Sequence, residues 1–145
     1  MSSDLIAVAA MIVGFGTVVI MFRIQRELLI RENPAKYPDW PTWLACADSL
    51  ILASVVMAVF LVVVPLLAFP TVTRCREALA AASCVSAVLL QVGYIPAILA
   101  HYRIGIVAQR NIARERGEPA EKVFVVLSIA LAALAFAFVF CRHTV

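Results

Sequence analysis

Four long stretches of apolar residues alternate with segments that carry most of the charge. The apolar stretches run from Leu5 to Phe22, Leu44 to Phe69, Ala78 to Ala100 and Val123 to Phe140. Each is as long as the roughly 17 to 25 residues that a helix needs to cross a bilayer. The pattern predicts an all-α, polytopic membrane protein with four transmembrane helices in an up-down bundle.

The composition supports a membrane protein. Hydrophobic residues make up 64% of the chain and charged residues 14%, which is more apolar surface than a soluble fold of this size can cover. The connections between the spans are too short to hold a second domain, so residues 1–145 are expected to form a single transmembrane domain. The first span is expected to be retained, because no Lys or Arg precedes it.

Positive charge is concentrated in the first and third connections. Of the 12 Lys and Arg residues, four lie in the first connection and five in the third. The positive-inside rule therefore places these two connections in the cytoplasm and both termini outside. We expect a multi-pass plasma membrane protein, and the excess of Arg over Lys favours the bacterial inner membrane. The net charge of +3 sets the orientation and is not taken as a sign of nucleic-acid binding.

Helix-ending signals come late after the first and third spans. Nothing interrupts the helical pattern after Phe22 until Asn33 and Pro34, and Gly117 is the first C-terminal signal after the third span. Helices 1 and 3 are therefore predicted to extend into the cytoplasm. Pro119 is suited to the first turn of the last helix.

Prolines and small residues predict details of the helices. The second helix is expected to begin near Pro41 or Thr42, and Pro65 should disturb its later part. Small residues four apart permit close helix contact, either within the bundle or with another chain. These pairs are Ala10 with Gly14, Ser83 with Ala87, Gly93 with Ala97, and Ser128 with Ala132.

Asp48 is the one acidic residue inside the predicted spans. An ionisable group at that depth needs a partner or water. It is either an ion or proton site at the cytoplasmic mouth, or a boundary carboxylate paired with Arg103 or His101, which the topology places at the same depth.

Gln91, Tyr94 and His101 are further candidates for a polar site in the membrane or at its interface. Gln91 is the most polar group deep in the third span, and it can line a pathway or form a hydrogen bond between helices. Pro96 frees the carbonyl group of Val92, because proline has no N–H.

Arg103, Arg110 and Arg114 share one face of the third helix's extension, since they are spaced by seven and four. This basic stripe can bind anionic lipid headgroups, an acidic partner or a soluble anion. The alternative is a solvated face that only sets the orientation.

The sequence shows no motif for catalysis, a metal or a cofactor. The four cysteines have no ligand spacing, and His101 alone does not indicate a metal. Only Cys75 and Cys141, both at outer helix ends, are placed to form a disulfide. We expect no cofactor, and the enzyme interpretation is the weaker one.

The sequence therefore favours a non-enzymatic integral membrane subunit of a homo- or hetero-oligomeric complex. It would bind a partner or anionic lipid through its cytoplasmic helical extensions. One alternative is a small oligomeric ion channel or transporter with a path past Asp48 and Gln91. A second alternative is a membrane-embedded enzyme with a cytoplasm-facing pocket at His101 and Tyr102.

Overall fold

The computed structural model describes residues 2–32, 45–69, 73–101 and 119–144, which are helical apart from short turns and helix ends. Its elements are α1 (Ser2–Glu32), α2 (Asp48–Met57), the π-helix η1 (Ala58–Val63), α3 (Val64–Ala68), α4 (Arg74–His101) and α5 (Pro119–Thr144). α2, η1 and α3 follow one another without a break. The described chain thus contains four helical stretches that are long and apolar enough to span a membrane, which confirms the predicted class.

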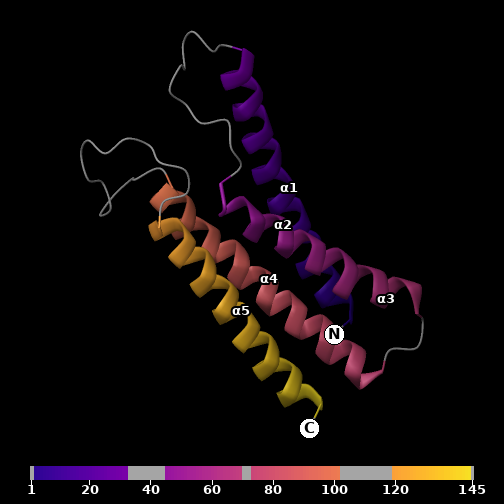
Figure 1. Ribbon diagram of the computed structural model, residues 1–145. Coiled ribbons are helices and arrows are strands. Elements are labelled where there is room, and N and C mark those ends of the chain that lie inside the picture. The colour runs from indigo at the N-terminus through magenta and orange to yellow at the C-terminus, as the bar shows by residue number, and fades with distance from the viewer. Residues whose placement is uncertain (1, 33–44, 70–72, 102–118, 145) are drawn as a thin grey trace.

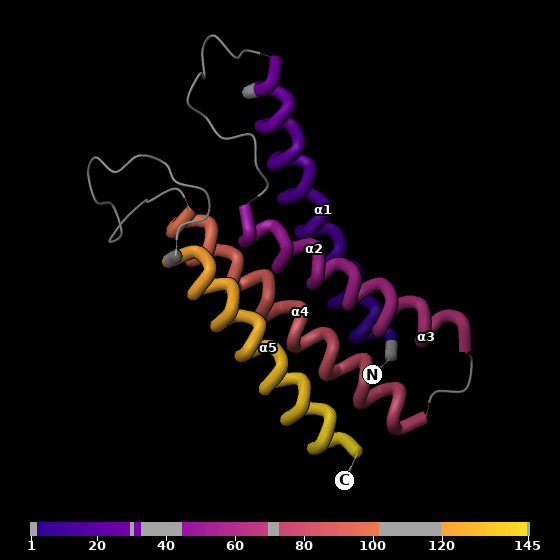
Figure 2. Tube along the Cα trace, in the orientation of Figure 1, coloured from indigo at the N-terminus to yellow at the C-terminus, as the bar shows by residue number. Residues whose placement is uncertain are grey.

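α4 is the central helix of the bundle. It contacts α5, α2, η1 and α1, and Figure 1 shows it between α2 and α5. Most of its buried positions are Ala or Ser, and such small side chains let helix backbones approach closely. α1 and α5 bury a much smaller share of their surface than α4 does. The tube view in Figure 2 shows α1 and α5 at the two sides of the bundle.

The buried apolar side chains form two clusters at different heights along α4. One joins α2, α4 and α5 and includes Leu50, Ile51, Leu90 and Val125. The other joins α1, η1, α3 and α4, with Ile12 among its members. Each cluster ties α4 to other helices, so α4 contributes to all of the buried core.

Three of the four small-residue pairs lie in the contact between α4 and its neighbours. Ser83, Ala87 and Ala97 are fully buried, and Ser128 and Ala132 on α5 are nearly so. A Cβ atom at Gly93 would overlap the side chain of Ser128. These residues therefore serve the close packing within the chain.

The fourth pair, Ala10 and Gly14, faces outward from α1. Both residues are exposed, and a Cβ atom placed on Gly14 would meet no atom within 4 Å. The glycine that brings α1 close to its neighbours is Gly16, where a Cβ atom would overlap Val55. The pair identified from its spacing thus makes no close helix contact among the described residues.

Two predicted helix bounds agree with the structure, and a third lies outside the described residues. α1 continues beyond Phe22 to Glu32, and α5 begins at Pro119, both as predicted. The start of the second helix expected near Pro41 or Thr42 lies outside the described residues. Within them, Ala45 to Ala47 form a turn and α2 begins at Asp48. The Asp48 carboxylate accepts the N–H of Ala45 at 2.9 Å and so stabilises this turn.

The irregularity expected near Pro65 takes the form of the π-helix η1. Pro65 has no N–H, and its ring would collide with the carbonyl group of Leu61 in a regular α-helix. The turn before it is widened, and the N–H of Val64 bonds to the carbonyl group of Val59 five residues earlier. A one-residue widening of this kind accommodates proline without ending the helix.

Candidate functional site

Asp48 forms an ion pair with Arg23 of α1. Nε of Arg23 lies 3.1 and 3.2 Å from the two carboxylate oxygens, and Nη2 lies 3.0 Å from Oδ2. The side chains of Arg23 and Asp48 are only 10% and 13% exposed. Of the two partners named from the sequence, His101 pairs with Glu121 and Arg103 lies outside the described residues.

Glu121 is a second buried acid at the same end of the bundle. It is 1% exposed, and its Oε1 accepts the backbone N–H of Ala47 at 2.8 Å. Its Oε2 lies 2.8 Å from Nδ1 of His101 on α4. An imidazole that carries a proton on Nδ1 donates this hydrogen bond, and a fully protonated imidazole also compensates the negative charge.

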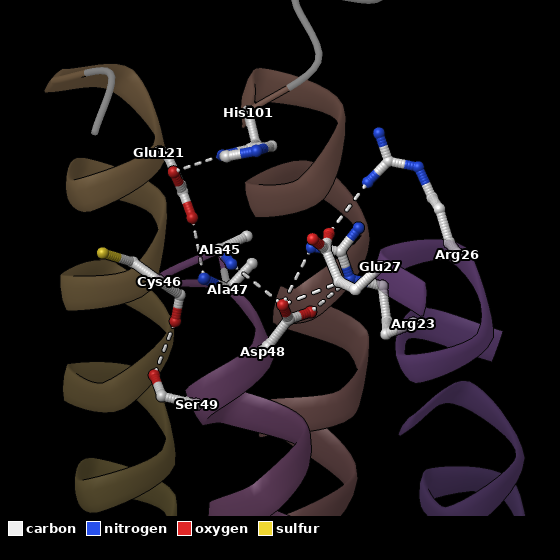
Figure 3. A network of polar contacts seen from close by, with 10 residues as sticks. All are labelled: Arg23, Arg26, Glu27, Ala45, Cys46, Ala47, Asp48, Ser49, His101 and Glu121. Atoms are coloured by element: carbon white, nitrogen blue, oxygen red, sulfur yellow. Dashed lines mark hydrogen bonds and ion pairs between the residues drawn. The ribbon is translucent and has the colours of Figure 1, made fainter. Parts of the chain in front are cut away.

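These contacts form one polar cap that joins the start of α2, the end of α4 and the start of α5 to one another and to α1 (Figure 3). We use this name for the side chains of Arg23, Asp48, His101 and Glu121 together with the backbone of Ala45 and Ala47. Each carboxylate receives one basic side chain and one backbone N–H. Buried carboxylates are tolerated when their charge and hydrogen bonds are satisfied in this way. The cap therefore fixes helix ends relative to one another.

The cap also matches the helix dipoles. Asp48 is the first residue of α2 and Glu121 the third of α5, where the positive ends of the dipoles favour acids. His101 is the last residue of α4, where the negative end favours a base. The described residues contain no group of three or more His, Cys, Asp or Glu side chains arranged to hold a metal ion.

Gln91 joins three helices in the middle of the bundle. Its Nε2 donates to the carbonyl oxygen of Ile12 on α1 at 2.8 Å and to Oγ of Ser54 on α2 at 3.2 Å. The Ser54 hydroxyl in turn donates to the carbonyl oxygen of Ile51 at 2.7 Å. A Cβ atom on Gly16 would lie 3.4 Å from Nε2 of Gln91, so the glycine gives the amide access to the α1 backbone. Gln91 is thus a link between helices.

Tyr94 is buried in the cluster that joins α2, α4 and α5. It lies one turn beyond the polar Gln91 and one turn before the fully buried Ala97. α4 continues through Pro96 to His101. Tyr94 and Ala97 therefore belong to the packed interior of the described helices.

Two other sequence predictions concern the arginine stripe and a disulfide. Arg103, Arg110 and Arg114 lie outside the described residues, as does the predicted extension of the third helix. Cys75 and Cys141 are both exposed free thiols, so the structure does not contain the disulfide considered for them.

An apolar groove of about 570 Å³ lies between α2 and α5 over α4. Ala53 and Met57 line it from α2, and Ile129, Ala133 and Phe136 from α5. Neither Asp48 nor Gln91 is among its lining residues. The groove is thus separate from the polar cap and from the Gln91 link.

Comparison of the chain with protein-family models, with curated proteins and with solved structures gives no significant match.

Sequence reasoning missed the roles of Arg23 and Glu121. Arg23 is one of several basic residues after the first span, and the sequence indicates for all of them only an effect on orientation. Glu121 lies two residues before the predicted start of the last span at Val123. A signal for Glu121 was present, because it stands at the third position of a helix that begins with Pro119, where acids are favoured.

Proposed function

We propose that the protein is a non-enzymatic integral membrane subunit of a homo- or hetero-oligomeric complex. The observation that carries this proposal is how the polar side chains of the spans are used. Asp48, Gln91 and Glu121 all bond to groups of neighbouring helices, which is the pattern of a structural bundle. A conduction path or catalytic pocket instead uses such groups to face water or substrate.

The outward face of α1 is the contact surface that fits this role best. Ala10, Gly14, Thr17 and Met21 are spaced by four, three and four residues, so they share one face, and all of them are exposed. Small residues at this spacing let a second helix approach closely. Inside the chain, the other pairs of this kind are used for close packing, which supports the same use of Ala10 and Gly14 between chains.

An association assay tests this surface. Labelled copies in liposomes should show energy transfer that rises with the protein-to-lipid ratio, and Gly14→Leu should weaken association about tenfold, equivalent to about 1.4 kcal/mol. Phe15→Trp is the matched control, because Phe15 is exposed and lies about 100° around the same helix from Gly14. Unchanged association of Gly14→Leu would exclude this contact surface, and a monomeric wild-type chain at every ratio would exclude the homo-oligomer.

We further propose an up-down arrangement with both termini outside and helices 1 and 3 extended into the cytoplasm. In a cysteine-free background, Ala35→Cys should resist an impermeant thiol reagent added to intact cells, whereas Val145→Cys should react. The reverse labelling pattern would invert the orientation. Nine of the 12 basic residues support the proposed one.

The stripe of Arg103, Arg110 and Arg114 is proposed to bind anionic lipid or an acidic partner. Arg110→Glu combined with Arg114→Glu should abolish recovery of that ligand while leaving the helical content unchanged. Equal recovery with both variants in place would remove the stripe from the function.

Ion flux separates this proposal from the channel alternative. Liposomes containing the purified protein should show no more flux than empty vesicles. Robust flux that is lost in Asp48→Asn or Gln91→Leu would replace the subunit proposal with a channel.

A further inference from the structure

The groove between α2 and α5 is concave and nearly free of polar groups. Its two serines are occupied, since Ser49 donates to the carbonyl oxygen of Cys46 at 2.6 Å and Ser86 to that of Ala132 at 2.9 Å. The remaining lining is apolar, so the groove offers water few hydrogen bonds. Its volume of about 570 Å³ falls in the range of roughly 300 to 1,000 Å³ that is usual for ligand sites.

A cation stands on the groove side of α5. Lys122 precedes Ile129 by seven residues and Ala133 by eleven, so all three share one face of the helix. Lys122 is exposed, whereas the neighbouring Glu121 is buried and bonded to Ala47 and His101. The bond from Ala47 to Glu121 also places Lys122 at the same end of the bundle as Ser49, where the groove begins.

The length of the site fits one leaflet of a bilayer. Lys122 and Phe136 are 14 positions apart, and 14 residues of α-helix rise about 21 Å. This is about half of the roughly 40 to 45 Å that separates the two headgroup surfaces. A transmembrane helix of a partner would need a groove across the whole hydrocarbon core of about 30 Å. One acyl chain extends through only about half of the hydrocarbon core.

We propose that this groove is a binding site for a single anionic phospholipid, with one acyl chain between α2 and α5 and the phosphate paired with Lys122. The cation at one end and the apolar body below it match the two parts of that ligand. The site uses no residue of the outward face of α1 or of the arginine stripe, so it stands or falls independently of the proposed function.

Native mass spectrometry of the delipidated full-length protein, titrated with phosphatidylglycerol or phosphatidylcholine of equal chain length, tests the site. The wild-type groove and each groove variant are compared in a background with Arg110→Glu and Arg114→Glu, which removes the lipid binding proposed for the arginine stripe. The wild-type groove should bind one phosphatidylglycerol more tightly than phosphatidylcholine. Ala133→Trp, which fills the groove, should weaken binding about tenfold, and Lys122→Gln should remove only the headgroup preference. Leu131→Trp is the matched control on the opposite flank of α5, where Leu131 is exposed, and it should bind as the wild type does.

Equal binding by Ala133→Trp and the wild type would overturn the proposal. An equal loss in Leu131→Trp would also overturn it, because the bound lipid would then be part of the general lipid shell. A dimer that disappears only in Ala133→Trp would show that a second copy fills the groove instead. If Ala133→Trp loses its helical circular dichroism, Ala53→Trp fills the groove from α2 and decides by the same criteria.

Discussion

Replacement of Arg23 by Met is the sharpest test of the polar cap. The change removes three hydrogen bonds to Asp48 and leaves that carboxylate with the N–H of Ala45. Breaking a buried ion pair by removing one partner costs about 3 to 5 kcal/mol, whereas an exposed pair is worth about 0.2 to 1 kcal/mol. Because both side chains keep about a tenth of their exposure, we expect the lower end of the buried range, about 3 kcal/mol.

The double variant Arg23→Met with Asp48→Leu isolates the pair. It removes both charges and leaves the Ala45 N–H without its carboxylate acceptor, a loss of about 1 kcal/mol. The double variant should therefore be about 2 kcal/mol more stable than Arg23→Met alone, and its loss should be smaller than the sum of the losses of the two single variants. The free energy of unfolding can be measured by titrating sodium dodecyl sulfate into detergent micelles and following the helical circular dichroism.

Arg26→Met is the control for this cycle. Arg26 lies one turn further along α1, its side chain is 30% exposed, and its contact with Glu27 is longer at 3.4 Å. Its loss should cost less than about 1 kcal/mol. If Arg23→Met costs no more than Arg26→Met, or if the two effects in the double variant simply add, the pair does not hold α1 to α2.

Three further variants address other contacts in the same unfolding assay. Gly93→Val places a side chain against Ser128 and should lower the free energy of unfolding by about 1 to 3 kcal/mol; a neutral result would mean that the helices separate there at little cost. Gln91→Leu loses the bonds to Ile12 and Ser54 and should cost about 1 to 2 kcal/mol, and unaltered stability would count against the link. Glu121→Ala leaves a backbone N–H of the turn before α2 without its acceptor and should cost about 2 to 3 kcal/mol, with faster hydrogen exchange at that amide; protected exchange would show that another group had taken over.

The sequence was sufficient for the helices but not for their neighbours. Long apolar stretches define each span, and Pro119 marks the start of α5, because these signals act within one helix. Which helices touch is harder to predict. In a bilayer, outward and inward faces are both apolar, so the sequence has little of the polar stripe that orients a helix in water.

The polar cap illustrates this limit. Asp48 and His101 were identifiable as ionisable groups at the membrane boundary. Their actual partners, Arg23 and Glu121, come from helices whose proximity depends on packing of the whole bundle. Small residues were more informative, because spacing alone identified Ser128 and its neighbours as contact positions. Spacing could not distinguish that buried set from the outward pair on α1.

The central place of α4 has a consequence for how the chain enters the membrane during synthesis. α4 is the least apolar of the four candidate spans and carries Gln91, which makes its insertion alone less favourable than that of the other three. The groups that accept the Gln91 amide, on Ile12 and Ser54, belong to helices that leave the ribosome earlier. The order of the helices along the chain thus provides hydrogen-bond acceptors in the bilayer before the helix that needs them arrives.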